Sequence, residues 1–102
     1  MLTKKIVSLC FLVLLSVTAL AQTKTVKGSV VEDESGAPLP GATVSIVGST
    51  RGVITDLDGS FELAGVKPTD RLVFDFFGKE SQTLTVGKES VFVIRMKDSA
   101  SQ

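Results

Sequence analysis

The chain has 102 residues, with 11 lysines and arginines against 11 aspartates and glutamates, and it contains no histidine, tyrosine or tryptophan. Two of the lysines, Lys4 and Lys5, belong to the N-terminal segment described next, so the rest of the chain is slightly acidic. Nucleic acids and anionic membrane surfaces need a basic patch and are excluded as partners, and the absence of histidine removes the commonest general base.

The first 21 residues have the pattern of a secretory signal peptide. Lys4 and Lys5 lead into the apolar run Ile6–Val17, which the segment Ala19-Leu20-Ala21 follows. This run is shorter than the roughly 20 apolar residues of a membrane-spanning helix. Cys10 lies inside it and is interpreted as part of the apolar region, so no cysteine follows the expected cleavage after residue 21. The sequence predicts an exported protein with no transmembrane segment once the signal peptide is cleaved.

From residue 22 onward, short apolar patterns of period two alternate with turn-forming residues. The first expected strand covers 26–30 and ends in the polar turn 32–36. Pro40 and Gly41 fit the second and third positions of a type II turn, which need a proline-like φ and a positive φ. A half-buried strand is expected to follow from Ala42 to Ile46.

Two more β-rich runs surround the dipeptide Asp58-Gly59. They cover 53–55 and 60–63. Asp-Gly between two such runs is a signal for a β-hairpin, because both residue types suit the tight turn. The sequence therefore predicts that these two strands pair with each other.

The last third of the chain contains three more expected strands. Leu72, Phe74 and Phe76 share one face of the first, and residues 84–86 mark the second. The third, Val91–Met96, is apolar on both faces, so it is expected at the centre of a sheet or covered on its second face.

About seven short strands separated by turns, with no helical periodicity, predict an all-β fold. A two-layer β-sandwich is the simplest solution for a chain of this length. The expected organisation is a signal peptide over residues 1–21, one sandwich domain over 22–97, and a polar tail without fixed structure over 98–102.

Two segments resemble the turns of a known family. The first runs from Gly28 to Val44 and reads GSVVEDESGAPLPGATV, and the second runs from Thr55 to Phe61 and reads TDLDGSF. They resemble the carboxypeptidase regulatory-like domain, in the form that opens Sus-type TonB-dependent outer-membrane receptors. The resemblance covers residues 26–96. It implies a transthyretin-like, seven-stranded sandwich that is not catalytic and serves as an accessory module.

The chain departs from the family pattern in two places. Receptors of this family continue into a plug and a barrel, whereas this chain stops shortly after its last expected strand. The resemblance therefore implies no transport activity for it. Family members also usually have Gly-Tyr after the aromatic strand, where this chain has Gly78 and Lys79, so a contact made by that tyrosine is not expected here.

The acidic pair Asp56 and Asp58 with Gly59 looks like the start of a calcium loop, but the twelfth position of such a loop is Lys67 instead of an acidic residue. Turn formation explains the same residues, and a solvated turn offers no cleft for two catalytic carboxyls. Arg51 is interpreted as a solvated loop charge. No catalytic, metal-binding or cofactor-binding residue is expected. The residues expected to shape turns are Pro38, Pro40, Gly41, Asp56, Asp58 and Gly59.

Phe77 is the aromatic residue that fits the core pattern least well. It lies opposite the face that Leu72 and Phe74 share, beside a glycine. Packing on the second face of the sheet is the first interpretation, and an exposed contact residue is the alternative. An exposed aromatic ring would allow stacking on a sugar.

These observations predict a non-catalytic, exported accessory module of the cell envelope, in the periplasm or at the outer membrane of a Gram-negative bacterium. Its expected partner is a protein, either a receptor barrel or an energy-coupling component. The alternative is a small carbohydrate-binding module that uses Phe77. The open edges of a sandwich also offer backbone groups that a partner strand could join.

Overall fold

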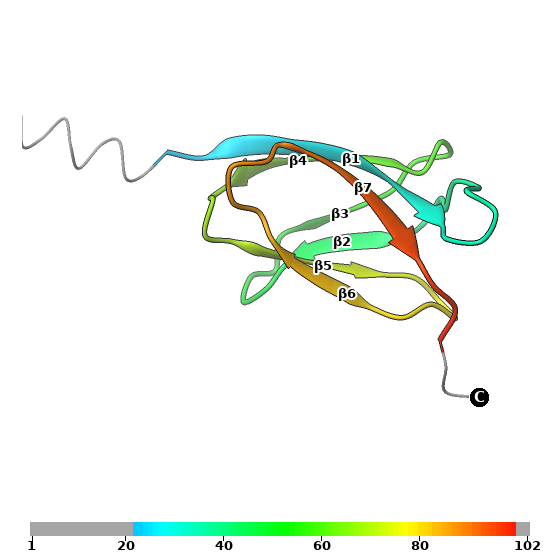
Figure 1. Ribbon diagram of the computed structural model, residues 1–102. Helices are drawn as coiled ribbons and strands as arrows, with labels where there is room; N and C mark the ends of the chain where they lie inside the picture. The colour runs from blue at the N-terminus through cyan, green and yellow to red at the C-terminus, as the bar shows by residue number, and fades with distance from the viewer. Residues whose placement is uncertain (1–21, 100–102) are drawn as a thin grey trace, which may run out of the picture.

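The computed structural model describes residues 22–99, and the expected signal peptide lies outside them. The described chain forms two sheets that pack face to face as a seven-stranded sandwich, which confirms the expected fold class (Figure 1). No helix within residues 22–99 is long and apolar enough to cross a membrane. The strands are β1 (Lys24–Glu32), β2 (Thr43–Ile46), β3 (Gly52–Ile54), β4 (Ser60–Val66), β5 (Arg71–Asp75), β6 (Gln82–Thr85) and β7 (Val91–Met96).

One sheet has the strand order β4-β1-β7 and the other has the order β3-β2-β5-β6. β1 pairs antiparallel with β4 and parallel with β7, and all pairings in the four-stranded sheet are antiparallel. The start of β1 and the end of β7 lie at opposite ends of the sandwich (Figure 1). β1 is thus the central strand of its sheet.

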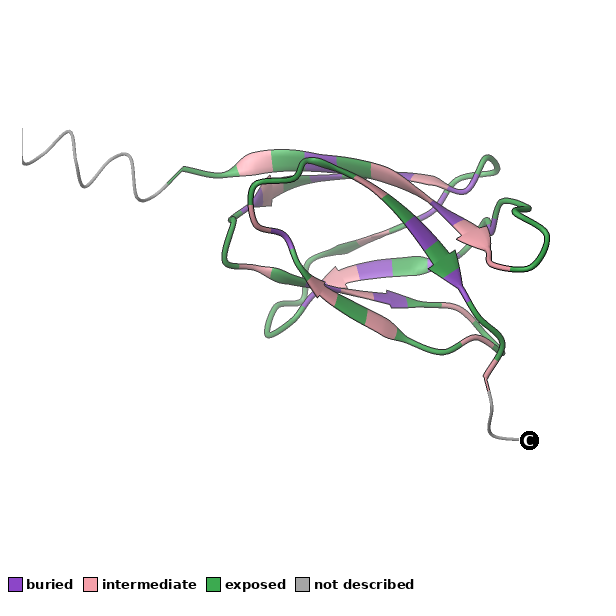
Figure 2. Cartoon of the chain, viewed as in Figure 1, coloured by how far each residue is buried: buried purple, intermediate pink, exposed green. Residues whose placement is uncertain are grey.

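The core lies between the sheets and consists of side chains that alternate along the strands (Figure 2). Val26 and Val30 of β1 are completely buried, as are Leu72 and Phe74 of β5. Phe61 of β4 meets Phe74 edge to face, with ring centroids 5.6 Å apart, so one aromatic pair connects the two sheets. The period-two pattern of the sequence therefore identifies the buried face correctly.

Gly28 faces the core between Val26 and Val30, where the structure leaves no room for a side chain. A Cβ atom at this position would lie 2.1 Å from the backbone oxygen of Phe92 and 2.9 Å from the ring of Phe61. The Phe61 ring therefore occupies the space above the glycine.

The expected hairpin around Asp58 and Gly59 is wrong. β3 pairs with β2, and β4 pairs with β1, so residues 55–59 connect the two sheets. The chain still reverses tightly there, because the Gly59 amide donates to the Asp56 carbonyl at 2.9 Å and Gly59 has a φ of 74°. The residue types specify this local reversal but not which distant strand each run joins.

The expectation that β7 is central or covered on both faces is also wrong. β7 is an edge strand, and its outer face leaves Val91 and Val93 exposed by 68% and 64%. Ile94 and Met96 point into the core. Valine favours extended backbone even at an exposed position, so an apolar run does not prove that both of its faces are covered.

Fixed structure continues beyond the expected end of the domain at residue 97. Asp98 forms an isolated antiparallel bridge with Lys79, and the Ser99 amide donates to the Gly78 carbonyl at 3.0 Å. These contacts hold the segment after β7 against the turn between β5 and β6. Residues 100–102 lie outside the described part of the chain.

Candidate functional site

The two segments that carry the family resemblance lie against each other. The Thr55 hydroxyl is buried, donates to the Leu39 carbonyl at 2.6 Å and accepts from the Ala42 amide at 2.9 Å. The Thr55 amide also donates to the Ala42 carbonyl at 2.9 Å, and the Gly41 amide donates to the Thr55 carbonyl at 3.1 Å. These hydrogen bonds attach the turn 38–42 to the end of β3.

The turn residues complete this arrangement. Pro38 forms an isolated bridge with Val31 of β1, and Pro40 and Gly41 form the turn that follows. Gly41 has a φ of 84°, a value that suits the third position of a type II turn. A Cβ atom on Gly59 would lie 3.0 Å from the Pro38 side chain, so the two turns touch. We interpret the resemblance motifs as structural elements of the fold.

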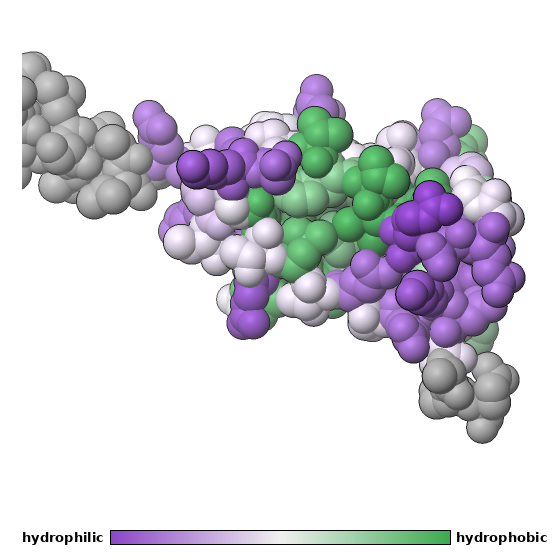
Figure 3. Space-filling view, viewed as in Figure 1, coloured by the Kyte–Doolittle hydropathy of each residue, from purple (hydrophilic) through white to green (hydrophobic). Residues whose placement is uncertain are grey.

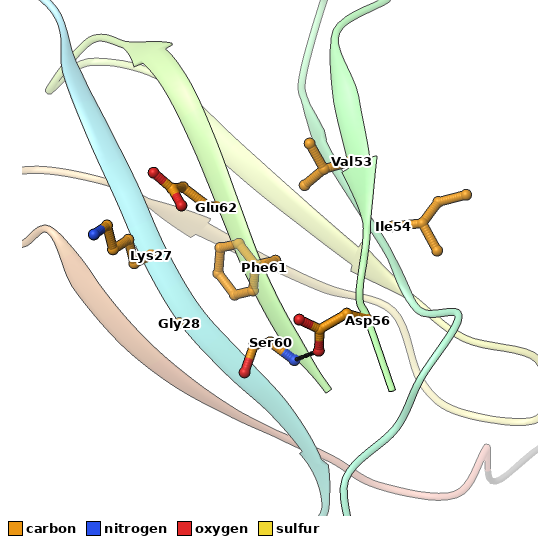
Figure 4. Close-up of a pocket in the computed structure, with 8 residues that line it drawn as sticks. All are labelled: Lys27, Gly28, Val53, Ile54, Asp56, Ser60, Phe61 and Glu62. Atoms are coloured by element: carbon orange, nitrogen blue, oxygen red, sulfur yellow. Dashed lines mark hydrogen bonds between the residues drawn. The ribbon is translucent and has the colours of Figure 1, made fainter. Parts of the chain in front are cut away.

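The acidic residues Asp56 and Asp58 do not converge on a common point. The Asp56 carboxylate accepts hydrogen bonds from the backbone amides of Asp58 and Ser60, each at 2.9 Å, and Figure 4 shows the one from Ser60. The Asp58 side chain is exposed. Within residues 22–99 no group of three or more acidic, cysteine or histidine side chains is placed to hold a metal ion. The local geometry is that of a carboxylate-stabilised turn.

A surface groove of about 490 Å³ lies between the edges of β3 and β4 (Figure 4). Val53 lies on the side of β3 that faces β4, and Phe61 contributes its ring. Lys27 and Glu62 are cross-strand neighbours of opposite charge at this groove. The groove therefore combines an apolar strip with one pair of opposite charges, which suits contact with another chain better than catalysis.

Arg51 is not the free loop charge that the sequence suggested. Its Nη1 atom donates to the Gly65 carbonyl at 2.9 Å, and its Nη2 atom donates to the Ala64 carbonyl. The register of β4 against β1 shifts here, and Gly65 has a φ of 71°, as in a glycine-type β-bulge. Arg51 thus links the β2–β3 loop to the bulge of the other sheet. The isolated glycine in a strand pattern was the signal that could have identified the bulge.

Lys79 connects three segments at the end of the sandwich where β7 stops. Its side chain is only 8% exposed, and its Nζ atom contacts the Glu32 carboxylate at 3.2 Å and the Asp98 carboxylate at 2.5 Å. The hydrogen bond to Asp98 raises the pKa of Lys79 above its ordinary value, with a further contribution from Glu32 that opposes the effect of desolvation.

Phe77 lies in the turn after β5 and is 98% exposed, so its ring does not pack on the second face of the sheet. A shallow hollow of about 290 Å³ lies beside it and is lined also by Gly41, Thr43, Asp75 and Phe76. The Asp75 carboxylate accepts a hydrogen bond from the Ser81 hydroxyl at 2.5 Å. An exposed aromatic ring therefore stands next to a carboxylate and a hydroxyl group.

The sequence matches the CarboxypepD_reg-like domain over residues 26–102. It is 41% identical over 83 residues to the TonB-dependent receptor SusC of Bacteroides thetaiotaomicron, an alignment that covers 81% of this chain and 8% of the receptor. It is 31% identical over 86 residues to the TonB-dependent receptor P3 of Formosa agariphila, which covers 84% of this chain and 9% of that receptor. The chain thus spans less than a tenth of the length of these relatives.

Among solved structures, the fold is similar to that of a chain in a type II cohesin–X–dockerin complex of Acetivibrio cellulolyticus, a C-terminal interface mutant. The TM-score is 0.57 at 26% sequence identity, over 72% of this chain and 56% of that chain. An N-terminal interface mutant of the same complex gives the same TM-score and identity. The sandwich geometry and the match over residues 26–102 agree, and the chain therefore belongs to the CarboxypepD_reg-like domain family.

Proposed function

We propose that this chain is a non-catalytic interaction module, exported to the cell envelope, that works with TonB-dependent receptors through a protein–protein contact. The similarity to two such receptors supports the association. A role in contact is supported by carboxylates that the fold itself uses: Asp56 closes a turn, and Glu32 and Asp98 pair with Lys79. The periplasm or the outer membrane is the proposed location.

The observation that carries this proposal is the exposure of Phe77 at a turn that is firmly held. The Lys79 amide donates to the Phe76 carbonyl at 3.0 Å, and the Lys79 side chain is fixed by two carboxylates. Gly78 is held by the Ser99 amide. Because the backbone that carries the Phe77 ring is already ordered, binding does not have to order it, and exposed aromatic residues carry much of the affinity of protein interfaces.

The surroundings of the anchor indicate what kind of partner it fits. A second hollow, of about 370 Å³, lies at the same end of the sandwich and is bordered by Glu32, Asp33, Glu34 and Asp98 together with Lys79, Lys97 and Met96. The acidic side chains outnumber the basic ones. A partner with an apolar pocket for Phe77 and basic residues around it would match this end.

The test is site-specific crosslinking in the native envelope. The full chain is produced with the photo-crosslinking residue benzoylphenylalanine at position 77, and the control carries it at Leu57, a turn residue that is 88% exposed. We expect position 77 to capture a TonB-dependent receptor or an energy-coupling protein, and Leu57 to capture much less of it. Equal capture at both positions, or none at 77, would contradict the proposed contact.

A carbohydrate contact is a second candidate function, because the hollow beside Phe77 also contains Thr43 and Asp75. Sugars are bound by an aromatic face together with carboxylates, which accept hydrogen bonds, and hydroxyl groups, which both donate and accept them. Calorimetry with oligosaccharides separates the two candidates. Binding that is lost in Phe77→Ala and in Asp75→Asn would support a glycan site, whereas binding that neither substitution changes would eliminate it.

A further inference from the structure

The outer edge of β7 carries backbone groups that point away from the sheet. On the inner side, the Lys27 amide donates to the Ser90 carbonyl at 2.8 Å and the Asp33 amide donates to the Met96 carbonyl at 3.0 Å. Backbone groups alternate in direction along a strand, so the amides and carbonyls of the odd-numbered residues point outward. β7 has no neighbouring strand on that side within residues 22–99.

The chain covers both ends of this edge with its own groups. The Glu80 amide donates to the Lys97 carbonyl at 2.8 Å, and the Gln82 side chain donates to the Arg95 carbonyl. At the other end, the Lys24 side chain donates to the Glu89 carbonyl. The outward groups left between these contacts are chiefly those of residues 91 and 93.

The edge of β4, in contrast, is largely blocked. The Ser60 amide and carbonyl both bond to Asp56, and Arg51 covers the Ala64 carbonyl at the bulge. Bulges and charged side chains of this kind prevent other chains from adding a strand. The centre of β7 has no such protection, so it is the more open of the two edges of this sheet.

The side chains of this stretch are apolar as well as exposed. Val91 is 68% exposed and Val93 is 64% exposed, both on the outer face of the three-stranded sheet. Phe92 and Leu84 are partly buried beside the core. The space-filling view shows apolar side chains gathered along β7 and below it toward β6 (Figure 3). A strand added here would cover apolar surface and satisfy backbone groups together.

We propose that the strand that pairs here is β7 of a second copy of the chain, antiparallel and related by a two-fold axis at Phe92. In this register Val91 lies opposite Val93 of the other copy. The outward-pointing backbone amides and carbonyls of these two residues therefore face each other and can form hydrogen bonds. Glu89 lies two residues before β7 begins, and Glu89 and Arg95 are each three residues from Phe92. If the register continues to Glu89, each acidic residue lies opposite the basic residue of the other copy. The sequence of the edge is therefore complementary to itself, as a two-fold contact requires.

Arg95 can pair with Glu89 of the other copy and still keep its hydrogen bonds to Asp33. Its Nε and Nη2 atoms donate to Asp33, each at 3.1 Å, which leaves Nη1 outside these bonds. The guanidinium side chain is 55% exposed. Because only a short stretch of strand pairs, the contact area is small, and we expect a dissociation constant on the order of 100 µM.

The first experiment measures self-association of the protein recovered from cells that express the full chain. Sedimentation equilibrium is run up to millimolar concentration on the wild type, on Val93→Lys and on the control Leu57→Lys, which adds the same charge at another exposed site. We expect association of the wild type and of the control, and at least about tenfold weaker association of Val93→Lys. A wild type that stays monomeric, or a dimer that Val93→Lys leaves intact, overturns the proposal.

The second experiment tests the register by charge exchange. Glu89→Arg places two basic residues opposite each other in the dimer, and Arg95→Glu places two acidic residues opposite each other. Each variant alone should associate about tenfold more weakly than the wild type, because the repulsion occurs twice in a two-fold contact. A one-to-one mixture of the two variants restores opposite charges and should form a heterodimer. A mixture that associates no better than either variant overturns the pairing, and thermal unfolding of each variant shows that it is folded.

Discussion

The Thr55 hydroxyl and the Leu39 carbonyl, 16 positions apart in sequence, form a buried hydrogen bond of 2.6 Å that joins the two turn segments of the family. The same hydroxyl accepts the Ala42 amide, so one side chain satisfies two backbone groups. Because both groups lie away from water, they depend on this hydroxyl.

Thr55→Val keeps the shape of the side chain but removes both hydrogen bonds. The Ala42 amide and the Leu39 carbonyl lose a buried partner, which should lower the free energy of unfolding by about 1–3 kcal/mol. Urea unfolding measures the change. Thr43→Val is the control, because Thr43 is exposed and its hydroxyl makes only a 3.4 Å contact with the Asp75 carbonyl. Equal losses of unfolding free energy in the two variants would show that the buried hydrogen bonds of Thr55 contribute no more to stability than the exposed contact of Thr43.

Gly28→Ala should be strongly destabilising, because its Cβ would lie 2.1 Å from the Phe92 oxygen and would press on the Phe61 ring. Either β7 must move away from β1 or the ring must leave its position. We expect a loss of about 3 kcal/mol in the free energy of unfolding, measured by urea unfolding. Ser29→Ala, on the opposite face of β1, should change stability by less than about 0.5 kcal/mol. A fully stable Gly28→Ala protein would be inconsistent with the described packing.

Arg51→Lys keeps the positive charge but loses the planar group that reaches two carbonyls at once. The carbonyls of Ala64 and Gly65 would exchange a protein partner for water, at a cost of about 1 kcal/mol. Hydrogen exchange should accelerate in the second half of β4 more than in β5. Arg71→Lys, at another exposed arginine, is the matched control. Unchanged exchange around the bulge would mean that the Arg51 contact is not maintained in solution.

Lys79 makes stability depend on pH in the alkaline range. Its pKa is raised in the folded protein, chiefly by the hydrogen bond to Asp98, so the folded state holds this proton more tightly than the unfolded state does. Its contribution is therefore complete below the ordinary lysine pKa of about 10.5 and declines as the pH rises through the folded value.

The measurement compares urea unfolding of the wild type and Lys79→Met between about pH 8 and pH 11.5. The difference in unfolding free energy between them should be constant at the lower end and shrink toward the upper end. Other lysines titrate in both proteins and cancel in the difference. A difference that grows with pH would have the wrong sign for a lysine stabilised by carboxylates.

The sequence predicted those features that depend on neighbours along the chain. Alternation along β1 and β5 identified Val26, Val30, Leu72 and Phe74 as core residues, since a strand exposes and buries successive side chains in turn. Turn chemistry likewise located the reversal at Gly59. It did not show that this turn joins two sheets, because an Asp-Gly reversal is compatible with either connection.

The candidate site was harder to predict, because its contacts join residues distant in sequence. Arg51 bonds to carbonyls 13 and 14 positions away, and Lys79 reaches Glu32, which is 47 positions away. No local pattern distinguishes such residues from solvated charges. The exposure of Phe77 was likewise undecided, since a turn residue beside a strand can face either way until the opposite sheet is placed.

The parallel pairing of β1 with β7 has a mechanical consequence. The chain enters at the start of β1 and leaves at the end of β7, so tension between these two points pulls the strands in opposite directions along their shared axis. The hydrogen bonds between residues 27–32 of β1 and the neighbouring strand β7 would then be loaded in shear and would have to break together. A hairpin that is pulled at its open end, in contrast, breaks one hydrogen bond at a time. Extension along this axis should therefore meet more resistance in this sheet than in a hairpin that is pulled open at its ends.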